Sequence, residues 1–527
     1  MKKFFKILNI LLVTLIIFLV GFFIGKKYDF AFDENDNIIG LRYNKNEQKI
    51  KRLVSLIDNQ YINNINSDTI VDKTINYMVG NLDPHSTYLD KEMIKKAQEE
   101  QKGVFSGIGL NFRILNDTIV VTRMIKGTPN YNKLKFGDRI LAVNNVVVTG
   151  KNTKLFTKLI KEDKGLNFDF KIDRDHKIRT ENLQITSVPI PTVTGSHMLT
   201  DDIGYLKLAR FGEKSANEVH KGLQNLLNQG MKTLVFDLRG NPGGLINVAE
   251  QIADEFLTKG ELIFYTQDKT KEKKFVYATD KGLFEKVKIY VLIDENSASA
   301  SEIIAGAIQE YGRGIIVGRR SFGKGLVQRE IDLGDGTRVR LTVANYFTPS
   351  GRSIQRPYDK GNQEYIDDLH QRLKNGELYN KDSIKVNTNL KYKAPSGKIV
   401  YGGGGIIPDE FVPFDITSIS NWLTYNNESN SYQEFIVKDA DKFHNLFLLE
   451  KENRYVKYFG SGVLRNDFLN FIGVPTHQFD KKISTTIDNY IKATLAQELF
   501  GSYAYYKIWL PEDEMIKKVL ELERTKF

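Results

Sequence analysis

The sequence of 527 residues predicts an α/β protein that is built around a mostly parallel sheet. Residues 289–293 form a short apolar run, which is typical of a buried strand. A polar turn follows, then a helical pattern over residues 298–311 and a second apolar run over residues 315–317. The same alternation comes earlier, with strands expected at residues 203–211 and 234–239 and helices at 215–229 and 246–257. Strands that alternate with helices favour a parallel sheet.

Composition excludes several classes of protein. A hydrophobic fraction of 41% indicates a globular chain, and its length allows several domains. The absence of cysteine excludes disulfides, thiolate metal sites and a cysteine protease. The seven histidines include no pair at a zinc-binding spacing, so we expect neither a metal nor another cofactor. The net charge of +10 comes from scattered lysines without a nucleic-acid motif, which favours a solvated surface and no nucleic-acid partner, although weak attraction to anionic lipid or acidic proteins stays open.

The N-terminus predicts a membrane anchor. Three lysines within the first six residues precede an apolar stretch at residues 7–24, whose length approaches a bilayer span. Two further lysines follow this stretch, where a cleaved signal peptide would carry small residues. We therefore expect residues 1–27 to form an uncleaved signal anchor, with its basic end in the cytoplasm and the rest of the chain exported. A cleaved signal peptide is the alternative.

Two polar turns carry candidate catalytic side chains. Ser297, Ser299 and Ser301 lie at the start of the helix expected at residues 298–311, where backbone N–H groups can hold developing negative charge. Serine is also favoured there as an N-cap for structural reasons alone. Lys324 lies in the glycine-flanked turn SFGKGLVQ, and a lysine in a partly apolar site can lose its proton and act as a base. The alternative is a solvated lysine; Gln328 lies close enough in sequence to orient the amine.

A glycine-rich loop, DLRGNPGG at residues 237–244, lies between an expected strand and an expected helix. Its glycines allow the backbone to approach a ligand closely. A phosphate-binding loop is the competing interpretation, but the loop has neither the Gly-Lys-Ser/Thr ending nor the GxGxxG spacing. We expect Asp237 and Arg239 to form a structural pair.

Residues 101–188 resemble a PDZ domain. The resemblance depends on the loop that contains Gly107, Ile108, Gly109 and Leu110, and on FGDRI and AVNN further along. It implies that the loop captures the C-terminal carboxylate of a peptide, which then adds as a strand. The alternative is a small sheet domain that only regulates access.

The chain contains three motifs, DLRGNPGG, SASASE and FGKGLVQ, in this order. With them it resembles the carboxyl-terminal processing proteases, a tail-specific serine peptidase family whose members contain a PDZ domain. The resemblance extends over residues 40–412. The resemblance implies that Ser299 is the nucleophile, Lys324 the base and Gln328 the residue that orients it. Glu302 matches a family acidic position beside the nucleophile.

The resemblance also implies an oxyanion hole, formed by the N–H of Gly243 or Gly244 and by that of Ala300. It implies a crotonase/ClpP-like β/β/α protease core with a PDZ domain placed before it. It further supports the orientation of the anchor, with the catalytic part on the periplasmic or extracytoplasmic side of the inner membrane. Expected partners are protein substrates with apolar C-termini, the membrane, and a second copy or an adaptor.

The predicted domains are the signal anchor (1–27), an N-terminal helical region (28–100), the PDZ domain (101–188), the protease core (189–411) and a helical C-terminal extension (412–527). Within the core, residues 356–399 form an insertion that is rich in Lys, Asp, Asn and Tyr, and we expect a charged surface excursion without an assigned role. His85, in the turn LDPHSTYL, is expected to be structural. A catalytically silent scaffold and a hydrolase of non-peptide esters are the alternative functions.

Overall fold

The computed structural model describes residues 14–15, 29–32, 38–41, 45–162, 167–415, 431–438, 463–475 and 481–525. The chain divides into two compact units, Met1–Val79 and Gly80–Phe527, which are described separately. Apart from Thr14 and Leu15, the predicted membrane anchor lies outside the described residues. In the described part of the chain, no helix has the length and apolar character needed to cross a membrane. The signal anchor therefore stays a prediction.

The first unit contains a hairpin and helices. Strand β1 (Asp29–Phe32) pairs with β2 (Ile38–Leu41) in an antiparallel arrangement, and α2 (Lys45–Gln60) and α3 (Ser67–Gly80) follow. Helices thus follow a strand hairpin in the region that was predicted to be helical. Three apolar side chains of α2 are 41–57% exposed, namely Ile50, Leu53 and Leu56.

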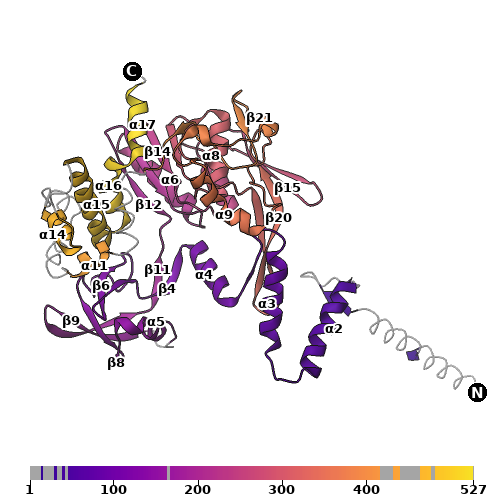
Figure 1. Cartoon of the computed structure of the whole chain (residues 1–527), viewed down its shortest axis with the longest axis horizontal. Helices are drawn as coiled ribbons and strands as arrows, with labels where there is room; N and C mark the ends of the chain where they lie inside the picture. Colours follow the sequence, from indigo (N-terminus) through magenta and orange to yellow (C-terminus); the bar gives the residue numbers. More distant parts are fainter. Residues whose placement is uncertain are drawn as a thin grey trace, which may run out of the picture. The chain divides into compact units, whose positions relative to one another are not determined.

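The second unit is organised around a six-stranded sheet with the order β12-β13-β14-β17-β18-β23. These strands are β12 (Val193–Met198), β13 (Ile203–Leu208), β14 (Thr233–Asp237), β17 (Lys288–Ile293), β18 (Gly314–Gly318) and β23 (Glu410–Phe411). Strands β12 and β13 pair antiparallel, and all the other neighbours pair parallel. The predicted mostly parallel sheet is therefore confirmed (Figure 1).

Each face of this sheet is covered because its strands are apolar on both sides. Leu234 and Phe236 of β14 join the cluster that includes helices α6 (Ser215–Asn228), α7 (Ile246–Asp254) and α8 (Ala300–Tyr311). The alternate residue Val235 points to the opposite face, where it joins side chains of α17 (Glu514–Arg524). The sheet therefore fixes the strand ends from which the catalytic loops leave.

A second sheet has the order β16-β15-β20-β19, with β3 paired to β20. Its strands are β3 (Thr87–Leu89), β15 (Leu262–Asp268), β16 (Lys273–Tyr277), β19 (Leu326–Asp332) and β20 (Arg338–Phe347). Helices α7 and α8 contact β15, and Phe264 and Tyr346 of this sheet belong to the same apolar cluster as the helices. The core is thus a mixed α/β structure; its relation to crotonase-like and ClpP-like folds stays a prediction.

The predicted PDZ domain forms its own sheet with the order β10-β9-β7-β6-β5, and β8 pairs with β7. The elements are β5 (Leu110–Leu115), β6 (Thr118–Met124), β7 (Arg139–Val143), β8 (Val146–Val147), α5 (Thr153–Glu162), β9 (Asn167–Arg174) and β10 (Lys177–Gln184). Strand β4 (Val104–Gly107) enters the domain and β11 (Thr186–Pro189) leaves it, and the two pair antiparallel. Helix α4 (Lys91–Lys102) precedes β4.

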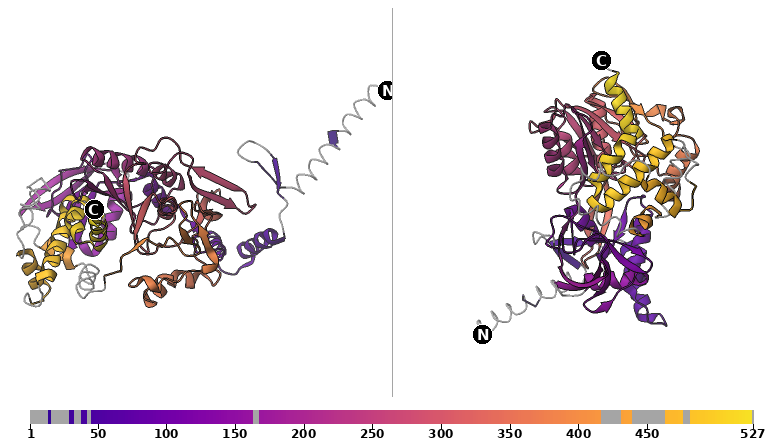
Figure 2. Two further views of the ribbon diagram at one scale, coloured as in Figure 1. Left: turned by 90° about the horizontal axis from the view of Figure 1, so that it is seen from above. Right: turned by 90° about the vertical axis from the view of Figure 1, so that its left-hand side faces the viewer.

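The described residues of the C-terminal extension lie mostly in helices. Its described helices are α11 (Ser431–Lys438), α14 (Val463–Phe471), α15 (Lys481–Phe500), α16 (Ser502–Trp509) and α17. Helix α15 contacts β6 of the PDZ domain, α16 contacts β12, and α17 contacts β18, so the yellow helices in Figure 2 bridge the PDZ domain and the core. Arg113 of β5 pairs with Glu498 of α15 at 2.9 Å.

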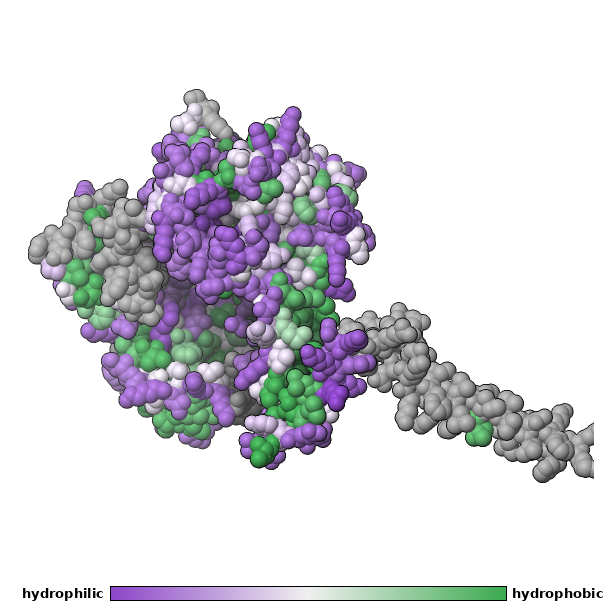
Figure 3. All heavy atoms as spheres, turned by 45° about the vertical axis from the view of Figure 1, so that its right-hand side comes forward, coloured by the Kyte–Doolittle hydropathy of each residue, from purple (hydrophilic) through white to green (hydrophobic). Residues whose placement is uncertain are grey.

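The insertion at residues 356–399 is not a surface excursion throughout, so this prediction is wrong in part. It contains α9 (Asn362–Lys374), two 3-10 turns and β21 (Lys391–Lys393), which pairs with β22 (Ile399–Tyr401). Tyr365 and Arg372 of α9 are each only 4% exposed, because they pack against the core. The core surface at the top of Figure 3 is otherwise largely hydrophilic, which agrees with a solvated, charged face.

Candidate active site

Ser299 is distinguished from its two neighbours by its hydrogen bonds. The hydroxyl of Ser297 donates to the carbonyl of Leu238 at 2.8 Å, and that of Ser301 donates to the carbonyl of Asn241 at 3.0 Å. Both of these serines are fully buried, whereas Ser299 lines a cleft. Composition did not distinguish the three hydroxyls, and the prediction of Ser299 rested on the family motif; burial and hydrogen bonding also separate Ser299 from its two neighbours.

The backbone around Ser299 is unusual. Ser299 has φ +55°, a left-handed conformation that non-glycine residues seldom adopt and that often occurs at functional sites. It is the N-cap of α8 in a capping box, and its N–H donates to the Glu302 carboxylate at 2.8 Å. The sharp turn from β17 into α8 therefore presents the hydroxyl beside a helix N-terminus.

A cleft of about 1030 Å³ brings together the sequence-predicted residues from distant parts of the core. Its walls include Ser299, Ala300, Gly243, Gly244, Lys324 and Gln328. Apolar side chains from four segments also line the walls: Phe211, Leu245, Ile246, Ile303 and Leu326. Such a cleft can hold an extended peptide with apolar side chains beside a serine hydroxyl and a lysine amine.

The amine of Lys324 lies in surroundings that disfavour its charged form. Burial, the largest cause, and the positive charge of Arg340 together lower the pKa of Lys324 from 10.5 to about 8. Glu302 and Asp83 act in the opposite direction. Lys324 can therefore release its proton near neutral pH, as a general base requires.

Glu302 connects the nucleophile to the turn that carries Lys324. Its carboxylate is fully buried and accepts hydrogen bonds from the Ser321 hydroxyl at 2.5 Å and from the N–H groups of Gly323 and Lys324 at 2.7 and 2.9 Å, besides that of Ser299. Burial raises the pKa of Glu302 to about 7, although these hydrogen bonds lower it. One carboxylate thus fixes the relative positions of both catalytic candidates.

The glycine-rich loop approaches Ser299 more closely than any side chain would allow. Gly243 has φ +98°, and a Cβ atom there would lie 2.8 Å from the Cβ of Ser299. The Gly243 N–H donates to the Asn241 side chain at 2.9 Å. In the described part of the chain, the N–H groups of Gly244 and Ala300 have no protein acceptor. Of the three candidate donors, these two can bind an oxyanion.

Gln328 lines the cleft, but its amide contacts a different residue from the one predicted. The Nε2 atom donates to the Thr342 hydroxyl at 3.3 Å, and in the described chain no hydrogen bond joins it to Lys324. A β-bulge between Val327 and Gln328 shifts the register of β19 on β20. Bulges redirect side chains next to active sites, so this one sets the direction of the Gln328 side chain.

Comparison with known proteins identifies the family. Residues 202–362 match the model of peptidase family S41, residues 106–185 that of the PDZ domain, and residues 28–93 that of the activating protease CtpB N-terminal domain. A carboxy-terminal-processing protease of Bartonella bacilliformis is 34% identical over 301 residues, which cover 56% of this chain and 69% of that protein.

Two carboxy-terminal processing proteases of Bacillus subtilis are also similar. CtpB is 32% identical over 58% of this chain and 65% of its own length, and CtpA is 30% identical over 68% of this chain and 76% of its own length. The chain belongs to the carboxy-terminal processing family of serine peptidases. The predicted family, its enzyme class and the presence of a PDZ domain are thus confirmed.

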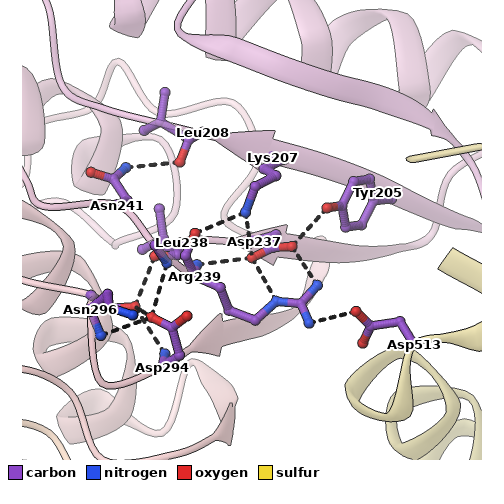
Figure 4. Close-up of polar contacts among 12 residues, drawn as sticks. Tyr205, Lys207, Leu208, Asp237, Leu238, Arg239, Asn241, Asp294, Asn296 and Asp513 are labelled. Atoms are coloured by element: carbon purple, nitrogen blue, oxygen red, sulfur yellow. Dashed lines mark hydrogen bonds and ion pairs between the residues drawn. The ribbon is translucent and has the colours of Figure 1, made fainter. Parts of the chain in front are cut away.

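A buried charge cluster supports the glycine-rich loop of the peptidase (Figure 4). Asp237 accepts hydrogen bonds from Arg239 at 2.7 Å and from the Tyr205 hydroxyl at 2.7 Å, and Lys207 lies 3.3 Å away. Burial alone would raise the pKa of Asp237, but the charges of Arg239 and Lys207 hold it well below its usual value. Arg239 also pairs with Asp513 of the C-terminal extension at 2.7 Å. Asp237 and Arg239 form the predicted structural pair.

The predicted peptide-binding residues of the PDZ domain lie at the start of its edge strand β5, which helix α11 of the C-terminal extension also contacts. Gly107 ends β4, and the carbonyl of the buried Ile108 accepts from Asn130 at 2.9 Å. Gly109 has φ +72°, and Leu110 begins β5, which is the last strand of its sheet. An extended peptide can pair with such an edge strand.

Sequence reasoning missed the side chains that surround the turn of Lys324. His85 lines the cleft, and its Nε2 atom lies 2.8 Å from the hydroxyl of Tyr365, 280 positions away. Burial, the largest cause, and the charge of Lys324 lower the pKa of His85 to about 4, so His85 is neutral near pH 7. No spacing rule would pair these residues. Among the described residues, no cluster of His, Asp and Glu could hold a metal ion.

Proposed function

We propose that Ser299 and Lys324 form the catalytic dyad of an endopeptidase that cleaves exported or membrane proteins in their C-terminal region. The observation that supports this proposal most strongly is the cleft, whose walls include Ser299, Lys324, Gly244 and Ala300. The lowered pKa of Lys324 supports its role as a base.

In the proposed reaction, neutral Lys324 accepts the proton of Ser299 while the Ser299 oxygen attacks a peptide carbonyl. The N–H groups of Gly244 and Ala300 stabilise the oxyanion. The protonated lysine then donates to the leaving amine, and a water molecule activated by Lys324 hydrolyses the acyl-enzyme. Gln328 orients the amine, which requires its amide to exchange Thr342 for Lys324.

The PDZ domain supplies the proposed selection of substrates. A tail that pairs with β5 places its terminal carboxylate at the loop of Gly107 to Leu110 and its last apolar side chain in the domain. The similar proteins are named for carboxy-terminal processing, which supports a tail as the recognised element. The basic and apolar residues at positions 1–27 support a location of the catalytic part outside the cytoplasmic membrane.

The test is degradation of an unstructured protein with an apolar C-terminus by the full-length chain. Wild type, Ser299→Ala and Lys324→Ala are compared, and we expect cleavage by wild type alone, with losses of at least about a thousandfold in the variants. Cleavage that survives Ser299→Ala would show that another residue is the nucleophile. Masking the terminal carboxylate as an amide should reduce the rate if the PDZ domain captures the tail.

A further inference from the structure

The turn that carries Lys324, residues 320–325, has no regular secondary structure of its own; we call it the base loop. On the side of the core, it is held by Glu302 and by a hydrogen bond from the N–H of Phe322 to the carbonyl of Ser297 at 3.0 Å. Its other side faces the insertion at residues 356–399. A loop that forms no backbone hydrogen bonds of a helix or sheet is held in position by the residues that contact it, here those of the core and of the insertion.

Arg372 of α9 binds the backbone of the base loop directly. Its guanidinium donates to the carbonyl of Ser321 at 3.1 Å and to that of Arg320 at 2.6 Å. Glu377, which follows α9, accepts from both Arg372 and Arg320. Because Arg372 is almost fully buried, its charge is stable there only while these partners stay in place.

Tyr365 of α9 belongs to an aromatic and guanidinium cluster beside the base loop. The guanidinium of Arg356 contacts two rings, 4.0 Å from the centre of Phe322 and 3.9 Å from that of Tyr365, and these rings meet edge-on. Arg356 precedes α9 and pairs with Asp368 of this helix at 2.6 Å. The Tyr365 hydroxyl reaches His85, whose ring meets the Tyr365 ring edge-on at 5.3 Å. Phe322, two residues before Lys324, thus contacts the insertion through the guanidinium of Arg356 and the ring of Tyr365.

The start of the insertion also bonds to the base loop through its backbone. The N–H of Arg356 donates to the carbonyl of Gly323 at 3.0 Å, and the side chain of the preceding Gln355 accepts from the N–H of Gly325 at 2.8 Å. These bonds lie on either side of Lys324 in the sequence. The insertion therefore contacts the base loop through backbone, ring and guanidinium groups at once.

We propose that the insertion is a brace that positions the general base, and that Tyr365 and Arg372 are its positioning residues. The inference rests on the proposed role of Lys324. Its physical reason is that the amine must be held within reach of Ser299 and away from water. A displacement of about 1 Å in a catalytic group can cost about a hundredfold in rate.

The brace also affects the ionisation of Lys324. The charged or titratable groups that face the amine are Arg340 from β20, Glu302 from α8, and Asp83 and His85 from the turn before β3. Burial is the largest cause of its lowered pKa. If the brace is removed, water reaches the amine and its pKa rises from about 8 toward 10.5. Activity, which requires the neutral amine, should then rise only at higher pH.

The test compares Tyr365→Ala with Ile366→Ala in the full-length protein, because Ile366 is the next residue of α9 and is 64% exposed. We expect Tyr365→Ala to lower kcat by about tenfold or more at neutral pH, with little change in KM, and to shift the rising limb of the pH profile upward. Tyr365→Phe keeps the ring against Arg356 and should restore most of the activity. Ile366→Ala should match wild type.

Amide hydrogen exchange of residues 320–325, measured by mass spectrometry in a Ser299→Ala background, tests the brace without activity. Tyr365→Ala should speed exchange there and Ile366→Ala should not. An unchanged pH profile together with unchanged exchange would overturn the inference. If the wild-type protein cleaves no peptide, the proposed function is contradicted. The hydrogen exchange of residues 320–325 would still show whether the insertion holds the base loop in place. If Tyr365→Ala does not fold, Tyr365→Leu keeps the apolar volume and carries the same expectations.

Discussion

The nucleophile and the base of this peptidase are held in different ways. Ser299 follows strand β17 and caps α8, and its N–H bonds to Glu302 three residues away. Lys324 lies in a turn without regular structure, which is enclosed by Glu302 on one side and by α9 of the insertion on the other. A short local motif sets the first position, whereas contacts across the chain set the second.

This difference has consequences for tolerance to change. The nucleophile can be displaced only by residues packed directly on its turn, such as Gly243. The base can be disturbed from further away, through its electrostatic neighbours and through the brace. Substitutions near Ser299 should therefore lower kcat at every pH. Substitutions around Lys324 should instead shift the pH dependence of the rate, because they change the pKa of Lys324.

Gly243→Ala should have the largest effect of the substitutions outside the dyad. A Cβ atom at Gly243 would meet the Cβ of Ser299 and the carbonyl of Ala298 at 2.8 Å, and φ +98° disfavours any side chain. We expect kcat to fall by about a hundredfold, since the nucleophile must move. Gly240→Ala is the matched control, because Gly240 also has a positive φ but has open space at its Cβ position. Equal activities of the two variants would contradict the close contact.

Arg340→Gln should have an intermediate effect that depends on pH. After burial, Arg340 is the next cause of the lowered pKa of Lys324, so its removal raises that pKa. Below this pKa, the rate follows the neutral fraction of the amine. A rise of about half a unit would lower kcat/KM at neutral pH by about threefold and leave the high-pH plateau unchanged. The measurement is a pH profile of kcat/KM.

The control for this variant is Arg338→Gln. Arg338 and Arg340 lie on the same strand, and both pair with Glu330, at 3.3 and 2.8 Å. Of the two, only Arg340 is among the charges that shift the pKa of Lys324. A shift of equal size in both variants would show that the change in Glu330 matters, not the charge of Arg340. High salt should reduce the effect of Arg340→Gln, because partly exposed charges are screened.

Sequence patterns predicted the parts of this molecule whose structure depends on residues close together in the sequence. The unit of strand, turn and helix around Ser299 follows from apolar periodicity, and the helix begins at Ala300 close to the expected position. The contact of His85 with Tyr365 could not be predicted, because tertiary contacts across 280 positions leave no spacing signal. The burial of Arg372 was missed for a related reason: a charged residue is expected at the surface unless its partners, here backbone carbonyls, are known.

The candidate site shows the same limit at the level of atoms. The motif identified two glycines as possible oxyanion donors, and only the hydrogen bond from Gly243 to Asn241 separates them. The direction of the Gln328 amide depends on a bulge in β19, and the residue types in this strand do not predict the bulge. The family motifs thus predicted several residues of the cleft wall, whereas their hydrogen-bond partners could be known only from the fold.

Asp513→Asn should have the smallest effect on activity and a measurable effect on stability. Asp513 caps α17 by accepting from the N–H groups of Met515 and Ile516, and it pairs with Arg239. Asparagine caps a helix about as well as aspartate, so this substitution removes the charge and keeps the cap. Arg239 keeps its bonds to Asp237, and kcat should stay within about twofold of wild type because the glycine-rich loop remains supported.

The expected loss in the free energy of unfolding for Asp513→Asn is about 1–2 kcal/mol, since the pair with Arg239 is mostly shielded from water, with side chains 14–16% exposed. Thermal unfolding of Asp513→Asn and of Glu514→Gln measures it. Glu514 is the next residue, is 58% exposed and pairs only with the nearby Lys517 among the described residues, so its loss should be small. Equal melting temperatures for the two variants would show that the C-terminal extension does not stabilise the glycine-rich loop through Arg239. A lower melting temperature for Asp513→Asn with unchanged kcat would separate anchoring of the loop from the chemistry at Ser299.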